Sequence, residues 1–151
     1  MISREIKMSV ETSAEDWELL AQVCQAYRNL SNAFMDQIEM HRAQATLLCH
    51  LFVQEGMTQS EIADQLSVQG ATVTNMLQRM EEAGLVTRQR DVEDNRLVRV
   101  YLTDEGRSKE RSIFQQFVKM EERMFEGLTQ EDRASLRRML RLVLDNMNKG
   151  G

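Results

Sequence analysis

The chain has 151 residues, of which 42% are apolar and 28% charged, and a formal net charge of −5. This length suits one domain with its own core, and the composition is that of a folded rather than a disordered protein. No apolar run is long enough to span a membrane, and the N-terminus lacks the pattern of a secretory signal. We therefore expect a cytoplasmic protein.

Two helices are predicted in the first third of the chain. A capping pattern at Ser13–Asp16 predicts a first helix from Asp16 to about residue 38. Two adjacent rows of apolar residues run along this helix. Their apolar surface is larger than packing against one partner requires. A second helix, predicted from about 42 to 54, is apolar over most of its circumference and belongs at the centre of the domain. Gly56 ends it.

A pair of shorter helices is predicted next. Thr58–Glu61 reads Thr-Gln-Ser-Glu, a capping box that opens a helix ending near Leu66. A further helix is predicted from about 71 to 83 and is closed by Gly84. Its inward positions follow helical spacing and comprise Val73, Met76, Leu77 and Met80.

The stretch from Gly84 to Thr103 is where the apolar period changes to two. Within residues 97–102 every second side chain is apolar and lies on the same face, which predicts a strand with that face buried. Residues 85–90 form a partner strand, and residues 91–96 form a charged loop too polar to bury. The pattern predicts a β-hairpin with arginines on its arms and tip.

The last third of the chain is predicted to be helical again. Thr103 caps a helix that reaches Gly127, and a Thr129–Asp132 capping pattern opens a final helix that ends near residue 147. Both helices carry broad apolar stripes. One larger helical core would bury them, but we favour a homodimer in which both chain ends pack against those of a second copy.

The order of these elements predicts a mainly α fold, a winged helix-turn-helix with the β-hairpin as its wing. We expect one domain over 1–151, with a DNA-binding lobe at 41–103 and helical dimerisation regions at 14–38 and 104–147. The outer face of the 71–83 helix carries uncharged hydrogen-bonding groups and one arginine, which can donate to and accept from base edges in a major groove. The negative net charge does not exclude DNA, because steering depends on where the charges lie.

Five segments taken together resemble one family. They are 58–63, 71–77, 80–86, 94–96 and 102–106. They are similar to the MarR (multiple-antibiotic-resistance regulator) family of prokaryotic transcription regulators. The resemblance implies a sequence-specific DNA-binding regulator, a repressor that acts as a homodimer on a pseudo-palindromic operator and is released by an effector.

The resemblance also implies roles for individual residues. The helix entering the major groove contributes Gln69, Ala71, Thr72, Thr74, Asn75, Gln78 and Arg79. Arg96 at the wing tip enters the minor groove, and Asp94 holds the shape of the wing. Arg88 and Arg90 then contact phosphate. The family often begins this helix with Ser-x-Pro, whereas this chain has Gln69-Gly70-Ala71.

Some members of the family sense oxidants through a thiol in the first helix, and others bind small aromatic acids. Cys24 is the candidate thiol here, although a cysteine in an apolar row is more often a small core residue. Tyr27, Phe34 and His50 are the candidate residues for an aromatic effector, with packing in the core as the alternative. The sequence does not identify the effector.

No pattern predicts catalysis, a cofactor or a metal site. The chain lacks a P-loop, the G-x-S-x-G and H-E-x-x-H motifs and a C-x-x-C pair. A second class of function stays open, a winged-helix dimer that binds a protein partner without reading DNA. Such a helix would expose apolar anchors, so the polar outer face favours DNA.

Overall fold

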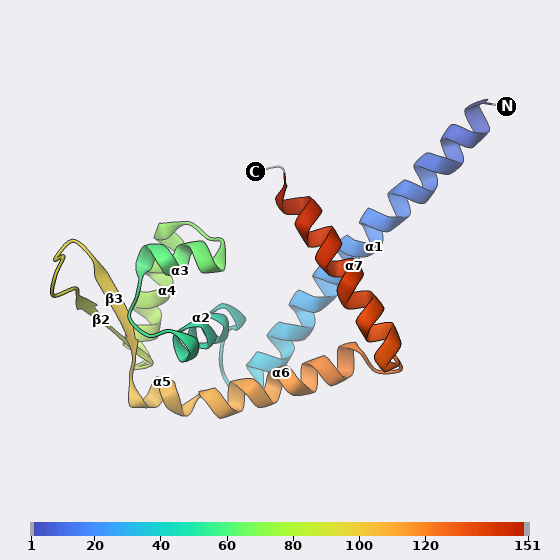
Figure 1. The fold of residues 1–151 in the computed structure, drawn as a ribbon. Helices are drawn as coiled ribbons and strands as arrows, with labels where there is room; N and C mark the ends of the chain where they lie inside the picture. The colour runs from blue at the N-terminus through green and yellow to red at the C-terminus, as the bar shows by residue number, and fades with distance from the viewer. Residues whose placement is uncertain (1, 150–151) are drawn as a thin grey trace. The chain divides into compact units, whose positions relative to one another are not determined.

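The computed structural model describes residues 2–149, with their side chains from residue 15 onward. The elements in chain order are α1 (Ile2–Asp36), α2 (Arg42–Val53), β1 (Met57–Thr58), α3 (Gln59–Leu66), α4 (Gly70–Glu82), β2 (Val86–Arg90), β3 (Val98–Leu102), α5 (Asp104–Ser108), α6 (Glu110–Met124) and α7 (Gln130–Asn148) (Figure 1). Two compact units are formed by Met1–Gln116 and Phe117–Gly151. The prediction of a mainly helical fold with a small hairpin is confirmed.

The core of the first unit lies where α2, α3 and α4 meet the sheet (Figure 1). Its fully buried side chains include Leu47, Leu48, Leu51, Ile62, Val73, Leu77, Met80, Val86 and Val100. The predicted inward face of α4 is confirmed at three of its four positions, whereas Met76 is half-buried. Burial of that face fixes the opposite face of α4 toward the outside.

The sheet has three antiparallel strands in the order β1-β3-β2. The hairpin pairs Val86 with Leu102 and Arg90 with Val98, as the period-two pattern predicts. β1 pairs Met57 with Val100 and was not predicted. A strand of two residues is too short to show a period of two.

Local capping chemistry sets the ends of α3 and α4. The Glu61 amide donates to Thr58 Oγ1 over 3.2 Å, and the Glu61 carboxylate accepts from the Thr58 amide over 2.7 Å. Gly84 has a φ of +71°, and the amide of Leu85 donates back to the Met80 carbonyl over 2.9 Å. The predicted capping box and glycine-terminated helix are both confirmed.

Two predictions about the first two helices are wrong. The first helix begins at Ile2 rather than Asp16, because residues 2–15 contain neither glycine nor proline to stop it. The side chain of Ser13 lies outside the described residues. The second helix, predicted to be apolar over most of its circumference and central, exposes its last residue, Val53, to 89%.

The helix expected from Thr103 to Gly127 is divided at Lys109. The amide of Lys109 bonds to the Gly106 carbonyl, three residues back, over 3.2 Å. This tight turn separates α5 from α6. α5 itself lies against the sheet so closely that a Cβ on Gly106 would come within 2.0 Å of the Leu85 carbonyl oxygen.

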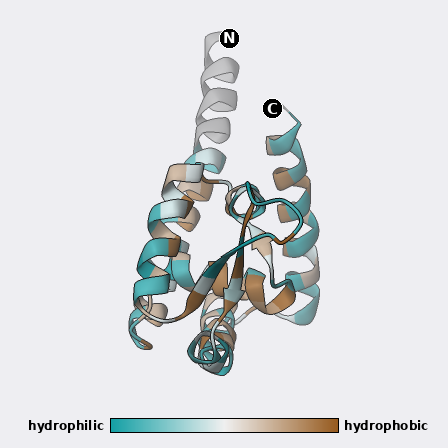
Figure 2. Cartoon of the chain, turned by 90° about the vertical axis from the view of Figure 1, so that its left-hand side faces the viewer, coloured by the Kyte–Doolittle hydropathy of each residue, from teal (hydrophilic) through white to brown (hydrophobic). Residues whose placement is uncertain are grey.

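Helices α1 and α7 each expose many large apolar side chains. On α1 these are Trp17, Leu19, Val23 and Tyr27, and on α7 they include Met139, Leu140, Leu142, Leu144 and Met147. No residue of α7 is buried. Brown apolar segments stand among teal hydrophilic ones on both helices (Figure 2). Among the described residues no helix has both the length and the apolarity needed to cross a membrane.

Candidate nucleic-acid interface

The outer face of α4 presents polar side chains to the outside. Thr72, Asn75 and Arg79 are exposed, and within the described residues their side chains form no hydrogen bond or ion pair. Gln78 is exposed and donates to the Glu82 carboxylate over 3.1 Å. These side chains are free to exchange hydrogen bonds with an outside partner at little cost.

Thr74 is partly engaged inside the molecule. Its hydroxyl donates to the Gly70 carbonyl over 3.0 Å and accepts from Gln59 Nε2 over 3.2 Å. The second bond ties α4 to α3 across the turn between them. Thr74 therefore combines an exposed position with a role in holding the two helices together.

The start of α4 is exposed and only weakly capped. Gln69 is the N-cap residue and makes no side-chain capping hydrogen bond, as its poor capping preference predicts. Gly70 has nothing within 4 Å of its Cβ position, and Ala71 is exposed. Without a side-chain cap, the first amides of α4 stay available to an outside acceptor such as a phosphate, apart from that of Thr72, which donates to the Gln69 carbonyl over 3.0 Å.

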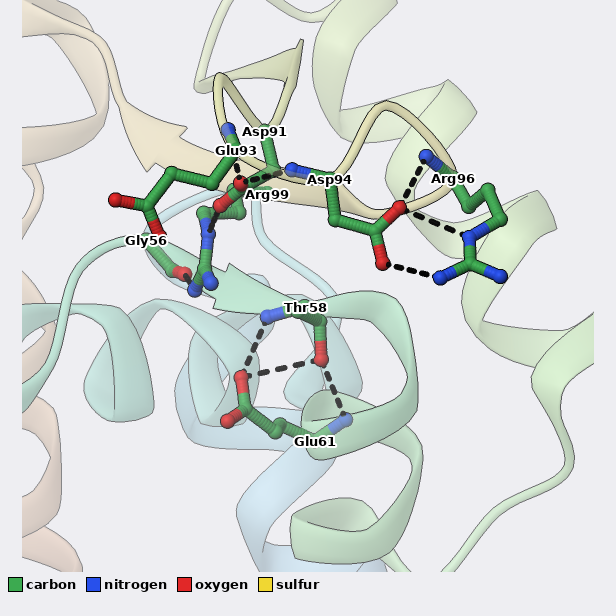
Figure 3. Close-up of polar contacts among 8 residues, drawn as sticks. All are labelled: Gly56, Thr58, Glu61, Asp91, Glu93, Asp94, Arg96 and Arg99. Atoms are coloured by element: carbon green, nitrogen blue, oxygen red, sulfur yellow. Dashed lines mark hydrogen bonds and ion pairs between the residues drawn. The ribbon is translucent and has the colours of Figure 1, made fainter.

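The loop between β2 and β3 is organised around Asp91. Its carboxylate accepts from the amides of Glu93 and Asp94, over 2.8 and 2.9 Å, and from Arg99 Nε (Figure 3). The Asp91 side chain is 13% exposed. The prediction that this loop is too polar to bury is wrong at Asp91, which organises the loop.

Arg96 stands at the tip of this loop and is 90% exposed. Its guanidinium donates to both oxygens of Asp94 over 3.0 Å, and its amide donates to the same carboxylate (Figure 3). The hydrogen bonds from Arg96 lower the pKa of the Asp94 carboxyl. The structure therefore brings together the two residues that the sequence assigned to the wing tip.

The other arginines of the hairpin differ in how freely they can act. Arg88 donates to Glu81 of α4 through Nε over 3.0 Å and through a terminal nitrogen over 2.7 Å. Arg99 donates to the Gly56 carbonyl over 2.9 Å as well as to Asp91. Arg90 is exposed, with one long contact to the Asn95 carbonyl at 3.4 Å.

Two carboxyl groups are held ionised by these arginines. The hydrogen bond from Arg99, followed by those from the loop amides, lowers the pKa of Asp91 to about 2. The hydrogen bond from Arg88 lowers the pKa of Glu81. The charges of Arg88 and Arg99 are thus compensated within the chain, whereas Arg79 and Arg90 have no ion-pair partner among residues 15–149.

The candidate effector residues differ in their exposure. Cys24 is exposed in the single chain, which does not fit the alternative of a small core residue. Tyr27 is exposed, and Phe34 and His50 are half-buried. An open hollow of about 380 Å³ lies on α7, lined by Ala134, Arg137, Arg138, Arg141, Leu142 and Asp145.

Among the described residues, neither the second cysteine nor the possible metal ligands form a reactive or metal-binding site. Cys49 is half-buried, and burial together with the nearby Glu110 carboxylate raises the pKa of its thiol, which disfavours the reactive thiolate. Across the residues that the structure describes, no group of three or more His, Cys, Asp or Glu side chains is placed to hold a metal ion.

Comparisons with known proteins agree with this architecture. The model of the MarR family matches residues 40–98. An uncharacterised HTH-type transcriptional regulator of Bacillus subtilis, YwoH, is 33% identical over 129 residues, which cover 83% of this chain and 93% of that protein.

Two solved structures that contain DNA also resemble the chain. A mutant MarR from E. coli complexed with operator DNA is 28% identical, with a TM-score of 0.78 over 84% of this chain and 91% of that one. The MepR–DNA complex of S. aureus is 25% identical, with a TM-score of 0.78 over 85% and 96%. The predicted winged helix-turn-helix fold is confirmed.

Proposed function

The chain belongs to the MarR family of HTH-type transcriptional regulators, and on that premise we propose that it binds double-stranded DNA as a homodimer with α4 in the major groove. The observation that carries the proposal is the outer face of α4, where Thr72, Asn75 and Arg79 are exposed and free of internal partners. Solved MarR and MepR structures of the same fold contain DNA, which supports this assignment.

Base reading is assigned to the middle of α4. An asparagine can donate to and accept from an adenine edge, and an arginine can donate twice to a guanine. Asn75 and Arg79 lie one helical turn apart, with Gln78 and Thr72 beside them. Gln69 and Ala71 lie at the start of the helix, where amides without a side-chain cap suit a backbone phosphate, and Thr74 lies one turn further along.

The wing supplies a second contact. Arg96, exposed at the tip, suits the negative potential of a narrow minor groove, and Asp94 fixes the direction of its guanidinium. Arg90 is assigned to phosphate. Arg88 reaches phosphate only by giving up its bond to Glu81, so we assign it first to bracing β2 against α4.

The homodimer is supported by the apolar faces of α1 and α7. Leu19 and Val23 of α1 are 61% and 54% exposed, and Leu142 of α7 is 60% exposed. Exposed apolar clusters of this kind mark protein interfaces. A twofold dimer presents two copies of α4 and therefore predicts a pseudo-palindromic site with half-sites about one helical turn apart.

A dimer bound to its DNA site prevents other proteins from binding there, and we therefore propose that the protein acts as a repressor. The effector that releases the DNA stays open, with Cys24, Tyr27, Phe34 and His50 as candidates. A regulator bound to the chromosome of a prokaryote works in the cytoplasm, which we propose as the compartment.

The alternative of a protein-binding module gains no support from α4. Its exposed side chains are polar, charged or small, and no large apolar anchor stands among them. Protein-binding helices display such anchors at i, i+3, i+4 and i+7.

The test is a duplex selected from a random-sequence pool by the full-length protein, followed by titration at several salt concentrations. We expect affinity to fall steeply with salt, and Arg96→Ala to weaken binding and reduce the slope. Failure to enrich any duplex, or binding that is insensitive both to salt and to Arg96→Ala, would overturn the proposal. Glu93→Gln is the control variant in the same loop.

A further inference from the structure

Arg99 lies among the arginines of the hairpin but is turned inward. Its Nε donates to the Asp91 carboxylate, and its Nη1 donates to the carbonyl of Gly56 over 2.9 Å. The Arg99 side chain is 34% exposed, whereas that of Arg96 is 90% exposed. Arg99 is thus a link inside the protein rather than a free cation on the wing.

The fixed end of this link is Gly56. Its amide donates to the Val100 carbonyl over 2.9 Å, and its φ of +75° places it in a tight turn between α2 and β1. The neighbouring residue Met57 pairs with Val100 in the sheet. The carbonyl that Arg99 binds is therefore held by the body of the winged helix.

The other end of the link is the wing loop. The Asp91 carboxylate accepts a hydrogen bond from Arg99. The Asp91 amide donates to the Leu97 carbonyl over 2.9 Å, which closes the loop. The same carboxylate accepts from the Asp94 amide, and Asp94 in turn accepts the guanidinium of Arg96 (Figure 3). An unbroken series of hydrogen bonds thus runs from the sheet to the tip.

We propose that Asp91 and Arg99 are positioning residues for DNA binding, which hold the wing loop so that Asp94 presents Arg96 to the minor groove. The inference rests on the proposed function, since it requires that the wing contacts DNA. A carboxylate in a DNA-facing loop opposes the phosphates by its charge. Its benefit must therefore come from geometry, because an ordered guanidinium loses less freedom on binding.

The direction in which one substitution changes the DNA affinity separates the effect of charge from the effect of positioning. Asp91→Asn removes a negative charge from the wing, so charge alone predicts tighter binding to the selected duplex. The positioning role predicts weaker binding, by about tenfold, the scale of coupling within one hydrogen-bond network. Glu93→Gln is the matched control: it makes the same charge change in the same loop, and its exposed carboxylate accepts no hydrogen bond among the described residues. We expect it to bind as tightly as the wild type or tighter.

A double-mutant cycle shows whether Asp91 acts through Arg96. In the Arg96→Ala background, we expect Asp91→Asn to cause no further loss. Arg99→Lys keeps the charge but lacks the planar fork that reaches both Asp91 and Gly56, and we expect it to repeat the loss. Circular dichroism and the thermal midpoint establish that each variant is folded, and Arg99→Lys serves if Asp91→Asn does not fold.

Two results would overturn the inference: Asp91→Asn binding as tightly as Glu93→Gln, or the same loss persisting in the Arg96→Ala background. Either leaves the proposed function intact if the wild-type protein still binds its selected duplex with a steep dependence on salt. A wild-type protein that selects no duplex defeats the proposed function itself, independently of Asp91.

Discussion

At the scale of single residues, the wing depends on carboxylates that are ionised at neutral pH. Asp91 accepts three hydrogen bonds, and its pKa is lowered from the ordinary 3.8 to about 2. Asp94 is shifted in the same direction by Arg96. A carboxyl whose pKa is lower in the folded state stabilises the fold above its ordinary pKa and loses that contribution as the pH falls through the folded value.

This shift predicts how acid changes the effect of Asp91→Asn. At neutral pH the variant has a lower free energy of unfolding than the wild type, because the ionised carboxylate is lost. Between pH 3.8 and about 2 the difference should shrink, since the wild-type carboxyl becomes protonated. Denaturant unfolding at a series of pH values measures it. A difference that stays constant across this range would contradict the assignment.

Gly106 predicts a second residue-scale effect. A Cβ at this position would lie 2.0 Å from the Leu85 carbonyl oxygen, which is backbone and cannot turn away. Gly106→Ala should therefore lower the free energy of unfolding by about 1–3 kcal/mol. Gly70→Ala is the control, because nothing lies within 4 Å of that position. It should stabilise the protein by about 0.4–1 kcal/mol. Equal effects of the two substitutions would show that α5 is not packed this closely.

At the scale of elements, the ion pair between Glu81 and Arg88 joins α4 to β2. The two side chains are 39% and 27% exposed and 2.7 Å apart. A pair this close to water contributes about 0.2–1 kcal/mol to stability. Its larger expected consequence concerns charge: while Arg88 is bound to Glu81, its guanidinium is not available to a DNA phosphate.

Glu81→Gln should therefore release Arg88 for DNA. We expect tighter binding and a dependence of log affinity on log salt that is steeper by about 0.9, the value for one added phosphate contact. Glu82→Gln is the control, since among the described residues Glu82 accepts a hydrogen bond from Gln78 and pairs with no arginine. Unchanged salt slopes in both variants would show that Arg88 does not reach phosphate.

The elements that could be predicted from sequence are those set by neighbouring residues. The capping pairs Thr58–Glu61 and Thr129–Asp132 mark helix starts over three residues, and both form as expected. The link from Arg99 to Gly56 spans 43 residues, and no local pattern reveals it. Likewise, the inward turn of Asp91 depends on Arg99 rather than on the polarity of its own loop.

The roles assigned to single residues have the same limit. Spacing alone predicts that Asn75 and Arg79 lie on the outer face of α4, and the structure places them there. Spacing cannot show that Arg88 is paired with Glu81, because both residues lie on elements whose packing is a tertiary property. Base contacts by these residues stay a prediction.

At the scale of the whole molecule, the apolar faces of α1 and α7 predict a homodimer, which a charged substitution in such a face should dissociate. Leu142→Asp places a charge on a side chain that is 60% exposed in the single chain. Burying such a leucine contributes about 1.5–3 kcal/mol, twice in a symmetric interface, so the dissociation constant should rise roughly a hundredfold or more.

Sedimentation equilibrium measures this change in the dimer. Val53→Asp is the control, because Val53 is 89% exposed at the end of α2 and does not belong to the apolar faces of α1 and α7. Dimers that form equally well in the two variants would contradict the assignment of α7 to the interface.

Base reading by the outer face of α4 carries the proposed function. The most direct measurement is the base-preference profile of the protein on a randomised duplex pool, compared between wild type, Asn75→Ala and Arg90→Ala. Asn75→Ala should flatten the preference at one position of each half-site, at a cost of about 1–3 kcal/mol for the preferred base. Arg90→Ala should weaken binding to all sequences without changing the profile. A profile that Asn75→Ala leaves unchanged would contradict the account.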